Sequence, residues 1–362
     1  MNRVRGQKAA EAVYIVLWLT CLKEPHFPFD SISEVAYRLG LTAVTAATGE
    51  QYLKENQIGD AFANEIVQAS TRVNYAANLG LIHGLEAIVC MAIEGAMAIK
   101  DGNWQIFSGM AQAATQDIRL NTSVISLHKQ EDGTFTLRSK PVEHPAVARP
   151  ASDTFDTVIV AAPYQFMDMR IDPEPQHLPA AVPYVSLHVT LFTSPHPLNP
   201  SFFNLPQGGK VPTSALTTLQ PDENYGATPA VGRAGFFSIS TLRTLHNPQT
   251  GTKEFLYKIF SVEEVGEEYL EKLLGAKMGE GCVSWVYRKV WKSYPYEYPR
   301  VTFEESRLDE DMWYTGGMDS FVSTMETNAL MGKNIARLVV DGWEEGKVGG
   351  VEDAERKGEL KR

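Results

Sequence analysis

The block near the carboxyl end of the chain constrains its fold most. An extended segment ends at Gly316-Gly317, and a polar turn leads into a helical run that begins near Met325-Glu326-Thr327. Ala329, Gly332 and Ala336 place small side chains on one face of that helix, so another group can approach its backbone closely. The first turn of a helix presents unpaired N–H groups and a positive dipole end to an anion or an electron-rich ring. The block therefore indicates a ligand-facing helix.

Glutathione-reductase-type flavoproteins hold the pyrimidine edge and ribityl chain of the flavin with such a helix. That superfamily also needs a strand, a G-x-G-x-x-G turn and a helix to bind the pyrophosphate of the cofactor. No G-x-G-x-x-G occurs in the 362 residues. We therefore expect the chain to correspond to the carboxyl-terminal part of a flavoprotein without its nucleotide-binding head.

Charge and cysteine content exclude several classes of function. The formal net charge of -11 argues against nucleic acid as a partner, because binding phosphates needs a basic face. Cys21, Cys90 and Cys282 are far apart and form no C-x-x-C, so we expect neither a disulfide framework nor a metal site. Cys90 stands in an apolar run and is predicted to be a buried small side chain.

The first residues, 1–24, form an atypical N-terminus. Basic residues precede the apolar run Ala12–Leu19, as in a signal peptide, but Lys23-Glu24-Pro25 stands where small residues should mark cleavage. The run is too short to span a membrane. A signal peptide, a buried helix and an artefact of the gene model all remain open. The sequon Asn121-Thr122-Ser123 supports a secretory route weakly.

The hydrophobic period predicts a helical region followed by strands. Residues 25–116 are expected to be a mainly helical substrate-side region, with helix caps at Ser31 or Ser33 and at Thr48. Residues 117–169 change to a period of two and are expected to be strands of the FAD domain, with a hairpin at Asp132-Gly133.

The second half of the chain is also expected to contain first a substrate region and then a part of the FAD domain. Residues 170–282 are rich in proline and predict a mainly antiparallel substrate domain with a short helix over 264–274. Residues 283–343 return to the FAD domain and its carboxyl-terminal helix, and 344–362 are expected to be a disordered tail. The predicted class is α/β (α+β): an incomplete glutathione-reductase or amine-oxidase-like FAD fold with a helical region and an antiparallel substrate-domain sheet.

Several motifs occur together in a specific combination. They are Phe62…Glu65-Ile66-Val67-Gln68-Ala69…Arg72-Val73-Asn74-Tyr75, Ile82-His83-Gly84-Leu85, Gly102-Asn103-Trp104, Trp285…Tyr287-Arg288-Lys289-Val290-Trp291…Ser293-Tyr294-Pro295 and Ser323-Thr324-Met325-Glu326-Thr327. Through them the sequence, from about Pro25 to Trp343, resembles the prenylcysteine oxidase (prenylcysteine lyase) family.

The resemblance implies an oxidoreductase with FAD as its cofactor. Its substrates would be O₂ and a small molecule, farnesyl- or geranylgeranyl-cysteine, whose thioether is cleaved to cysteine, a prenyl aldehyde and H₂O₂. It implies a role in the catabolism of prenylated proteins, a lysosomal or vacuolar glycoprotein, and no transmembrane segment. The pocket should be elongated and apolar, with a few polar groups for the amino-acid end.

Four polar residues in the helical region are the candidate catalytic residues. His83 lies beside Gly84 in apolar sequence, where a neutral imidazole could assist attack by water. Arg72, Asn74 and Tyr75 could hold the carboxylate of the substrate, since Arg binds carboxylates bidentately. The alternatives are a hydrogen-bonded core histidine and a polar network at a helix end.

The residues predicted to contact the cofactor lie in three segments, and none is expected to bind metal. They are Thr122, Val124, Ala161, Ala162, Pro163, Met325, Glu326 and Thr327. A dense aromatic set could line the pocket or form core, and the sequence leaves this open. The set is Trp285, Tyr287, Trp291, Tyr294 and Trp313.

Two other functions remain open. One is another FAD amine-oxidase-like oxidoreductase, against which the motifs in residues 62–85 argue. The other is a non-catalytic remnant that binds lipid or a partner, which the missing G-x-G-x-x-G would favour.

Overall fold

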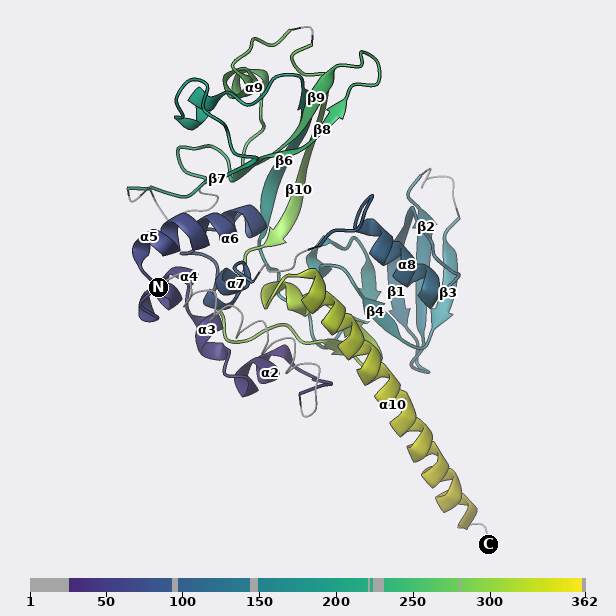
Figure 1. Cartoon of the computed structure of the whole chain (residues 1–362). Coiled ribbons are helices and arrows are strands. Elements are labelled where there is room, and N and C mark those ends of the chain that lie inside the picture. The colour runs from purple at the N-terminus through teal and green to yellow at the C-terminus, as the bar shows by residue number, and fades with distance from the viewer. Residues whose placement is uncertain are drawn as a thin grey trace. The chain divides into compact units, whose positions relative to one another are not determined.

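The computed structural model describes residues 26–92, 97–143, 149–220, 222–223, 231–279 and 281–359, so the predicted atypical N-terminus over 1–24 lies outside them. The described chain forms two compact units (Figure 1). Unit 1 contains Gly40–Ala92 and Val182–Val301. Unit 2 contains the described residues of Ile15–Leu39, Ile93–Ala181 and Thr302–Arg362.

Short helices make up the first segment of unit 1. They are α3 (Thr42–Ala46), α4 (Gly49–Glu55), α5 (Asp60–Phe62), the π-helix η1 (Ala63–Val67), α6 (Gln68–Tyr75) and α7 (Gly84–Val89). Thr48 and Gln51 form a capping box at the start of α4, which confirms the predicted cap. The helix α7 ends at Val89, and Cys90 is its C-cap residue.

An antiparallel sheet forms the second segment of unit 1; the range 283–343, which was expected to belong to the FAD domain, contributes its last strand, and the predicted range 170–282 contributes the others. Its strands are β6 (Tyr184–Ser194), β7 (Ser214–Leu216), β8 (Ser238–His246), β9 (Lys253–Ser261) and β10 (Trp285–Pro295), in the order β10-β6-β9-β8-β7. The 3₁₀ helix η3 (Pro200–Phe203) and α9 (Glu267–Leu274) lie between strands in sequence. The helix α9 falls within the predicted range 264–274.

The two faces of this sheet are buried by different elements. Phe192 and Ile259 pack with Leu273 of α9 on one face. Leu187 packs with Ala76, the residue after α6, on the other. Alternate residues of a strand point to opposite faces, so the register assigns every position of the sheet to the α9 face or the α6 face.

Unit 2 contains two small sheets. The first has the order β3-β2-β1-β5, with β1 (Thr122–Lys129), β2 (Phe135–Pro141), β3 (Ala151–Phe155) and β5 (Arg170–Asp172). The second has the order β11-β12-β4, with β4 (Val158–Val160), β11 (Arg307–Asp309) and β12 (Met312–Tyr314). Gly133, at φ 88°, lies in the predicted hairpin between β1 and β2. The strand β3 begins at Ala151 and pairs antiparallel with β2.

Helices complete unit 2. They are α2 (Ile32–Arg38), α8 (Trp104–Ala114), the 3₁₀ helices η2 (Tyr164–Phe166) and η4 (Gly316–Ser320), and α10 (Met325–Glu359). Ser31 caps α2 as expected. The helix α10 begins where the sequence predicted a helix start (Figure 1). It continues to Glu359, so the described part of the range 344–362, which was expected to be disordered, is helical. Glu, Lys and Arg favour helix, and no proline interrupts this stretch. No helix in the described ranges has the length and apolarity to cross a bilayer.

Candidate functional site

His83 is a buried cap at the start of α7. Its Nδ1 accepts a hydrogen bond from the Glu86 N–H at 3.1 Å, and the backbone N–H of His83 donates to the Glu297 carbonyl at 2.8 Å. The side chain is fully buried. The imidazole therefore satisfies one of the unpaired N–H groups of the first helical turn. The backbone N–H of His83 joins the start of α7 to the segment after β10.

Tyr75 and Asn74, at the end of α6, face the same cluster. Burial, followed by the nearby carboxylates of Glu86 and Glu297, raises the pKa of the Tyr75 phenol well above its ordinary value. A side-chain hydrogen bond joins Tyr75 to Glu86, and another joins Asn74 to the Cys90 thiol. Burial also raises the pKa of Cys90, which fits its predicted role as a buried side chain. Glu86 thus connects His83 to Tyr75 through its backbone and its side chain.

Arg72 points into a different network. Its Nε donates to the Thr217 carbonyl at 2.9 Å, its Nη1 to Asn78 Oδ1 at 2.8 Å, and its Nη2 to the Val231 carbonyl at 2.9 Å. The guanidinium also lies 5.2 Å from the ring centre of Phe237. Burial lowers the pKa of Arg72 to about 10, so the group stays charged at neutral pH. This geometry favours a structural role in joining α6 to the segment around β7.

The structure thus groups three of the four candidate catalytic residues. His83 and Tyr75 contact Glu86, and Asn74 bonds to Cys90, whose thiol interacts electrostatically with Glu86. The guanidinium of Arg72 bonds elsewhere. Contact between these residues and a substrate stays a prediction. Sequence reasoning missed Glu86 and Glu297, both fully or almost fully buried. Glu86 stands in the first turn of a helix, where a glutamate is an ordinary stabilising feature. Glu297 lies in irregular chain after β10 and belongs to no motif that the sequence analysis recognised.

The predicted cofactor contacts all lie in unit 2. Thr122 and Val124 are half-buried at the start of β1. Ala161 and Ala162 are exposed directly after β4, and Pro163 follows them. The strands β4 and β12 are parallel, so their carboxyl ends meet at one edge. The Thr315 N–H donates to the Val160 carbonyl at 3.1 Å across that edge.

The turn after β12 leads into the first turn of α10 at this edge. The Thr324 hydroxyl accepts a hydrogen bond from the Thr327 N–H at 3.2 Å, which caps the helix. Thr327 is buried, whereas Met325 and Glu326 are exposed. Ligands of α/β sheets bind outside the carboxyl ends of the strands, and anionic groups favour helix N-termini.

The small-residue face of α10 is open. Ala329, Gly332 and Ala336 are exposed, and a Cβ built on Gly332 would meet no atom within 4 Å. The opposite face buries Met331 and Ile335 in unit 2. Contact between this face or the start of α10 and a cofactor stays a prediction. The described residues contain no cluster of three side chains that could hold a metal ion.

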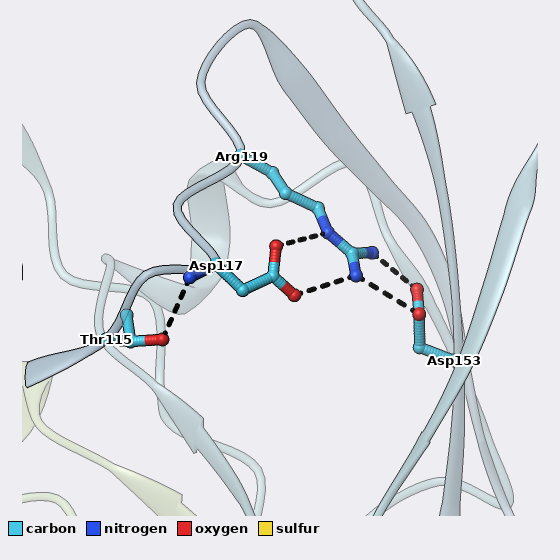
Figure 2. Close-up of polar contacts among 4 residues, drawn as sticks. All are labelled: Thr115, Asp117, Arg119 and Asp153. Atoms are coloured by element: carbon cyan, nitrogen blue, oxygen red, sulfur yellow. Dashed lines mark hydrogen bonds and ion pairs between the residues drawn. The ribbon is translucent and has the colours of Figure 1, made fainter.

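An ion-pair network fixes the chain before β1. Figure 2 shows Arg119 between Asp117 and Asp153, with bonds of 2.9–3.1 Å from Nη2 to the two carboxylates. The Thr115 hydroxyl accepts from the Asp117 N–H at 3.1 Å. Hydrogen bonding to Arg119 lowers the pKa of Asp153. The network joins the segment before Thr122 to the edge strand β3.

Comparison with known proteins identifies related sequences along most of the chain. A family model described as prenylcysteine lyase matches residues 18–352. Farnesylcysteine lyase of Arabidopsis thaliana is 27% identical over 316 residues, which cover 86% of this chain and 56% of that protein. Prenylcysteine oxidase 1 of Rattus norvegicus is 23% identical over 331 residues, covering 88% of this chain and 62% of that protein. The chain thus spans less than two thirds of the length of these relatives.

A solved structure shows the same fold. A single mutant of putrescine oxidase superposes with a TM-score of 0.50 at 13% identity, covering 83% of this chain and 69% of that chain. This likeness confirms the predicted amine-oxidase-like mixed α/β fold with its antiparallel sheet.

Proposed function

The chain belongs to the prenylcysteine lyase family. We propose that it forms part of an FAD-dependent oxidase that cleaves the thioether of farnesyl- or geranylgeranyl-cysteine. The match to the family model over residues 18–352 is the observation that carries the proposal. In the overall reaction, the carbon next to sulfur loses two electrons and gains its oxygen from water. The C–S bond breaks to give cysteine and a prenyl aldehyde, and O₂ is reduced to H₂O₂.

Bound FAD would supply the two-electron oxidation of that carbon. In this chain, Ala161, Ala162 and Pro163 at the β4 edge would lie along the cofactor. The exposed first turn of α10, with Met325 and Glu326, would direct backbone N–H groups to its electron-rich ring. Thr327 would act through the cap that holds this turn in place.

The α6–α7 cluster would serve the polar part of the reaction. His83 and Tyr75 are buried and Asn74 is half-buried, and polar groups in such surroundings interact more strongly than in solution. His83 would orient or deprotonate the attacking water, and Glu86 would hold Tyr75 in place. Arg72 would support this region through its buried hydrogen bonds.

The proposal is tested with the complete gene product that contains this sequence. The purified protein should show flavin absorbance and consume O₂ when farnesylcysteine is added, releasing peroxide and aldehyde in equal amounts. S-methylcysteine, which lacks the isoprenoid, is the control and should react far more slowly. Oxidation of amines in place of the thioether would favour another amine-oxidase-like enzyme. Flavin-free protein that still binds farnesylcysteine would favour a non-catalytic lipid-binding role.

We also propose that the protein is a lysosomal or vacuolar glycoprotein. Asn121 of the sequon is exposed, at a positive φ of 52°, directly before β1. This position leaves the amide open to a glycosyltransferase. Treatment with an N-glycosidase should lower the mass of the native protein, and Asn121→Gln should abolish the shift. An unchanged mass in both would contradict the proposal.

A further inference from the structure

The aromatic set Trp285, Tyr287, Trp291, Tyr294 and Trp313 divides into buried and exposed members, and all of them except Trp313 lie on β10. Trp313 is 5% exposed and belongs to unit 2, whereas Tyr294 packs against Tyr75 with ring centres 5.7 Å apart. Trp285, Tyr287 and Trp291 are 48%, 45% and 47% exposed. Burial thus separates three rings open to a ligand from two that serve the core.

The three exposed rings lie on one face of the sheet. Positions 285, 287 and 291 have the same parity, so they point to the same side of β10. Trp291 pairs with Leu187 of β6, which packs against the residue after α6, so this side is the α6 face. The rings of Trp285 and Tyr287 stack with centres 6.3 Å apart and planes 6° apart. Together the three form a strip about 20 Å long.

Neighbouring strands extend the strip into an open apolar surface. Tyr287 pairs with Leu191 of β6, which pairs in turn with Lys258 of β9. Leu191 is only half-buried, whereas Phe192, on the α9 face of the same strand, is fully buried. Beside Tyr287, the α6 face of β6 therefore keeps Leu191 partly open, whereas Phe192 on the α9 face of that strand is closed off.

Two lysines place positive charge on the same face. Lys289 Nζ lies 5.1 Å from the ring centre of Trp291, and Lys258 Nζ lies 4.4 Å from that of Phe260. The register puts both lysines on the α6 face, on the two strands that flank β6. Burial lowers the pKa of Lys258, which indicates a partly desolvated ammonium group.

We infer that Trp285, Tyr287 and Trp291 bind the isoprenoid chain of the substrate, and that Lys258 and Lys289 attract its carboxylate. Extended aromatic surface suits a branched hydrocarbon, and the adjoining ammonium groups complement the negative end of the same molecule. An amphiphile with both features fits this face better than a purely apolar or purely ionic ligand. The inference rests on the proposed function for the identity of the ligand.

Binding is tested without turnover, by anaerobic equilibrium dialysis of the complete gene product with farnesylcysteine. The double variant Trp285→Ala/Tyr287→Ala should bind farnesylcysteine at least about tenfold more weakly, because it removes two large apolar contacts. Val290→Ala is the matched control, because Val290 is 54% exposed on the other face of the same strand. Its affinity should equal that of the parent. A double variant that matches the parent overturns the inference.

The lysines are tested with a second ligand. Lys258→Met/Lys289→Met should weaken binding of farnesylcysteine but leave binding of S-farnesylcysteamine, which lacks the carboxylate, unchanged. Equal losses for both ligands, or no loss for either, would exclude a charge interaction with the carboxylate.

Failure of the inference and failure of the proposed function give different results. If the parent oxidises farnesylcysteine and the aromatic variants have the same affinity and KM as the parent, the proposed function stands and the role of the aromatic strip is overturned. If the parent binds farnesylcysteine through the strip but does not oxidise it, the role of the strip stands and the proposed reaction is overturned. A parent that neither binds nor oxidises it overturns both.

Discussion

Asn334 and Phe29 exchange two hydrogen bonds across 305 residues of sequence. The buried amide of Asn334 accepts from the Phe29 N–H at 2.8 Å and donates to the Phe29 carbonyl at 2.7 Å. The side chain thus satisfies both backbone groups of a residue that has no strand partner. Through this pair, α10 holds the segment that precedes α2.

Replacing Asn334 with Ala should destabilise unit 2 by about 2–4 kcal/mol, since it leaves a buried donor and a buried acceptor without their partner. Urea unfolding followed by circular dichroism measures the change. Asn328→Ala is the control, because Asn328 lies on the same helix but is exposed, and it should change the free energy of unfolding far less. Equal effects of the two substitutions would contradict a special role for Asn334.

Arg72→Met should lower stability while leaving the KM for farnesylcysteine unchanged. The substitution removes the hydrogen bonds of the guanidinium to the Thr217 and Val231 carbonyls and to Asn78, at a cost of roughly 2–4 kcal/mol in the free energy of unfolding. Thermal unfolding and steady-state kinetics of the complete gene product separate the two effects. Arg233→Met, at an exposed ion pair with Asp222, should change stability little. A raised KM with unchanged stability would instead support the predicted carboxylate anchor.

His83→Asn should separate capping from catalysis. Asparagine is a good N-cap, so this variant should keep the stability of α7, whereas His83→Ala should lose about 1 kcal/mol. Neither variant has an imidazole, so both should lower kcat if His83 acts on water. Denaturant unfolding and the pH profile of kcat measure the two effects. A stable His83→Asn variant with the kcat of the parent would show that the residue only caps the helix.

Acid should weaken unit 2 through the pair Lys129–Asp309. Burial alone would raise the pKa of Asp309, but the Lys129 ammonium at 2.9 Å and the Glu310 N–H lower it overall. A carboxyl whose folded pKa lies below the unfolded value of about 3.9 stabilises the fold above that pH. This contribution is lost as pH falls through the folded pKa.

The variant Asp309→Asn should therefore be less stable than the parent at pH 6, and the difference should shrink at pH 3. Chemical denaturation at the two pH values measures it. Glu310→Gln is the control, because Glu310 is mostly exposed and lies 3.7 Å from the same ammonium. A difference for Asp309→Asn that does not change with pH would refute the assignment.

The sequence predicted those features that depend on residues close together in the chain. The caps at Ser31 and Thr48, the Asp132-Gly133 hairpin and the start of α10 depend on residues within a few positions of one another, and all are present. The segments around Ala161 and Met325 were placed by resemblance, and the parallel pairing of β4 with β12 explains why both reach one edge.

Long-range partners were not predictable. Arg72 bonds to Thr217, which lies 145 residues away, so its sequence context resembled that of a ligand-binding arginine. Glu297 lies close to His83 and Tyr75 because the chain after β10 runs beside α6 and α7, which are more than 200 residues earlier in the sequence. The aromatic set could be divided only once the register of β10 against β6 was known.

The position of β10 at the edge of its sheet also bears on how the protein stays in solution. An exposed strand with large apolar side chains invites a strand of another molecule to pair with it. Along β10, Arg288, Lys289 and Lys292 lie among those side chains and carry like charges that repel a second copy. The lysine and arginine positions of this strand thus protect against aggregation, and neutralising them would make the protein prone to self-association.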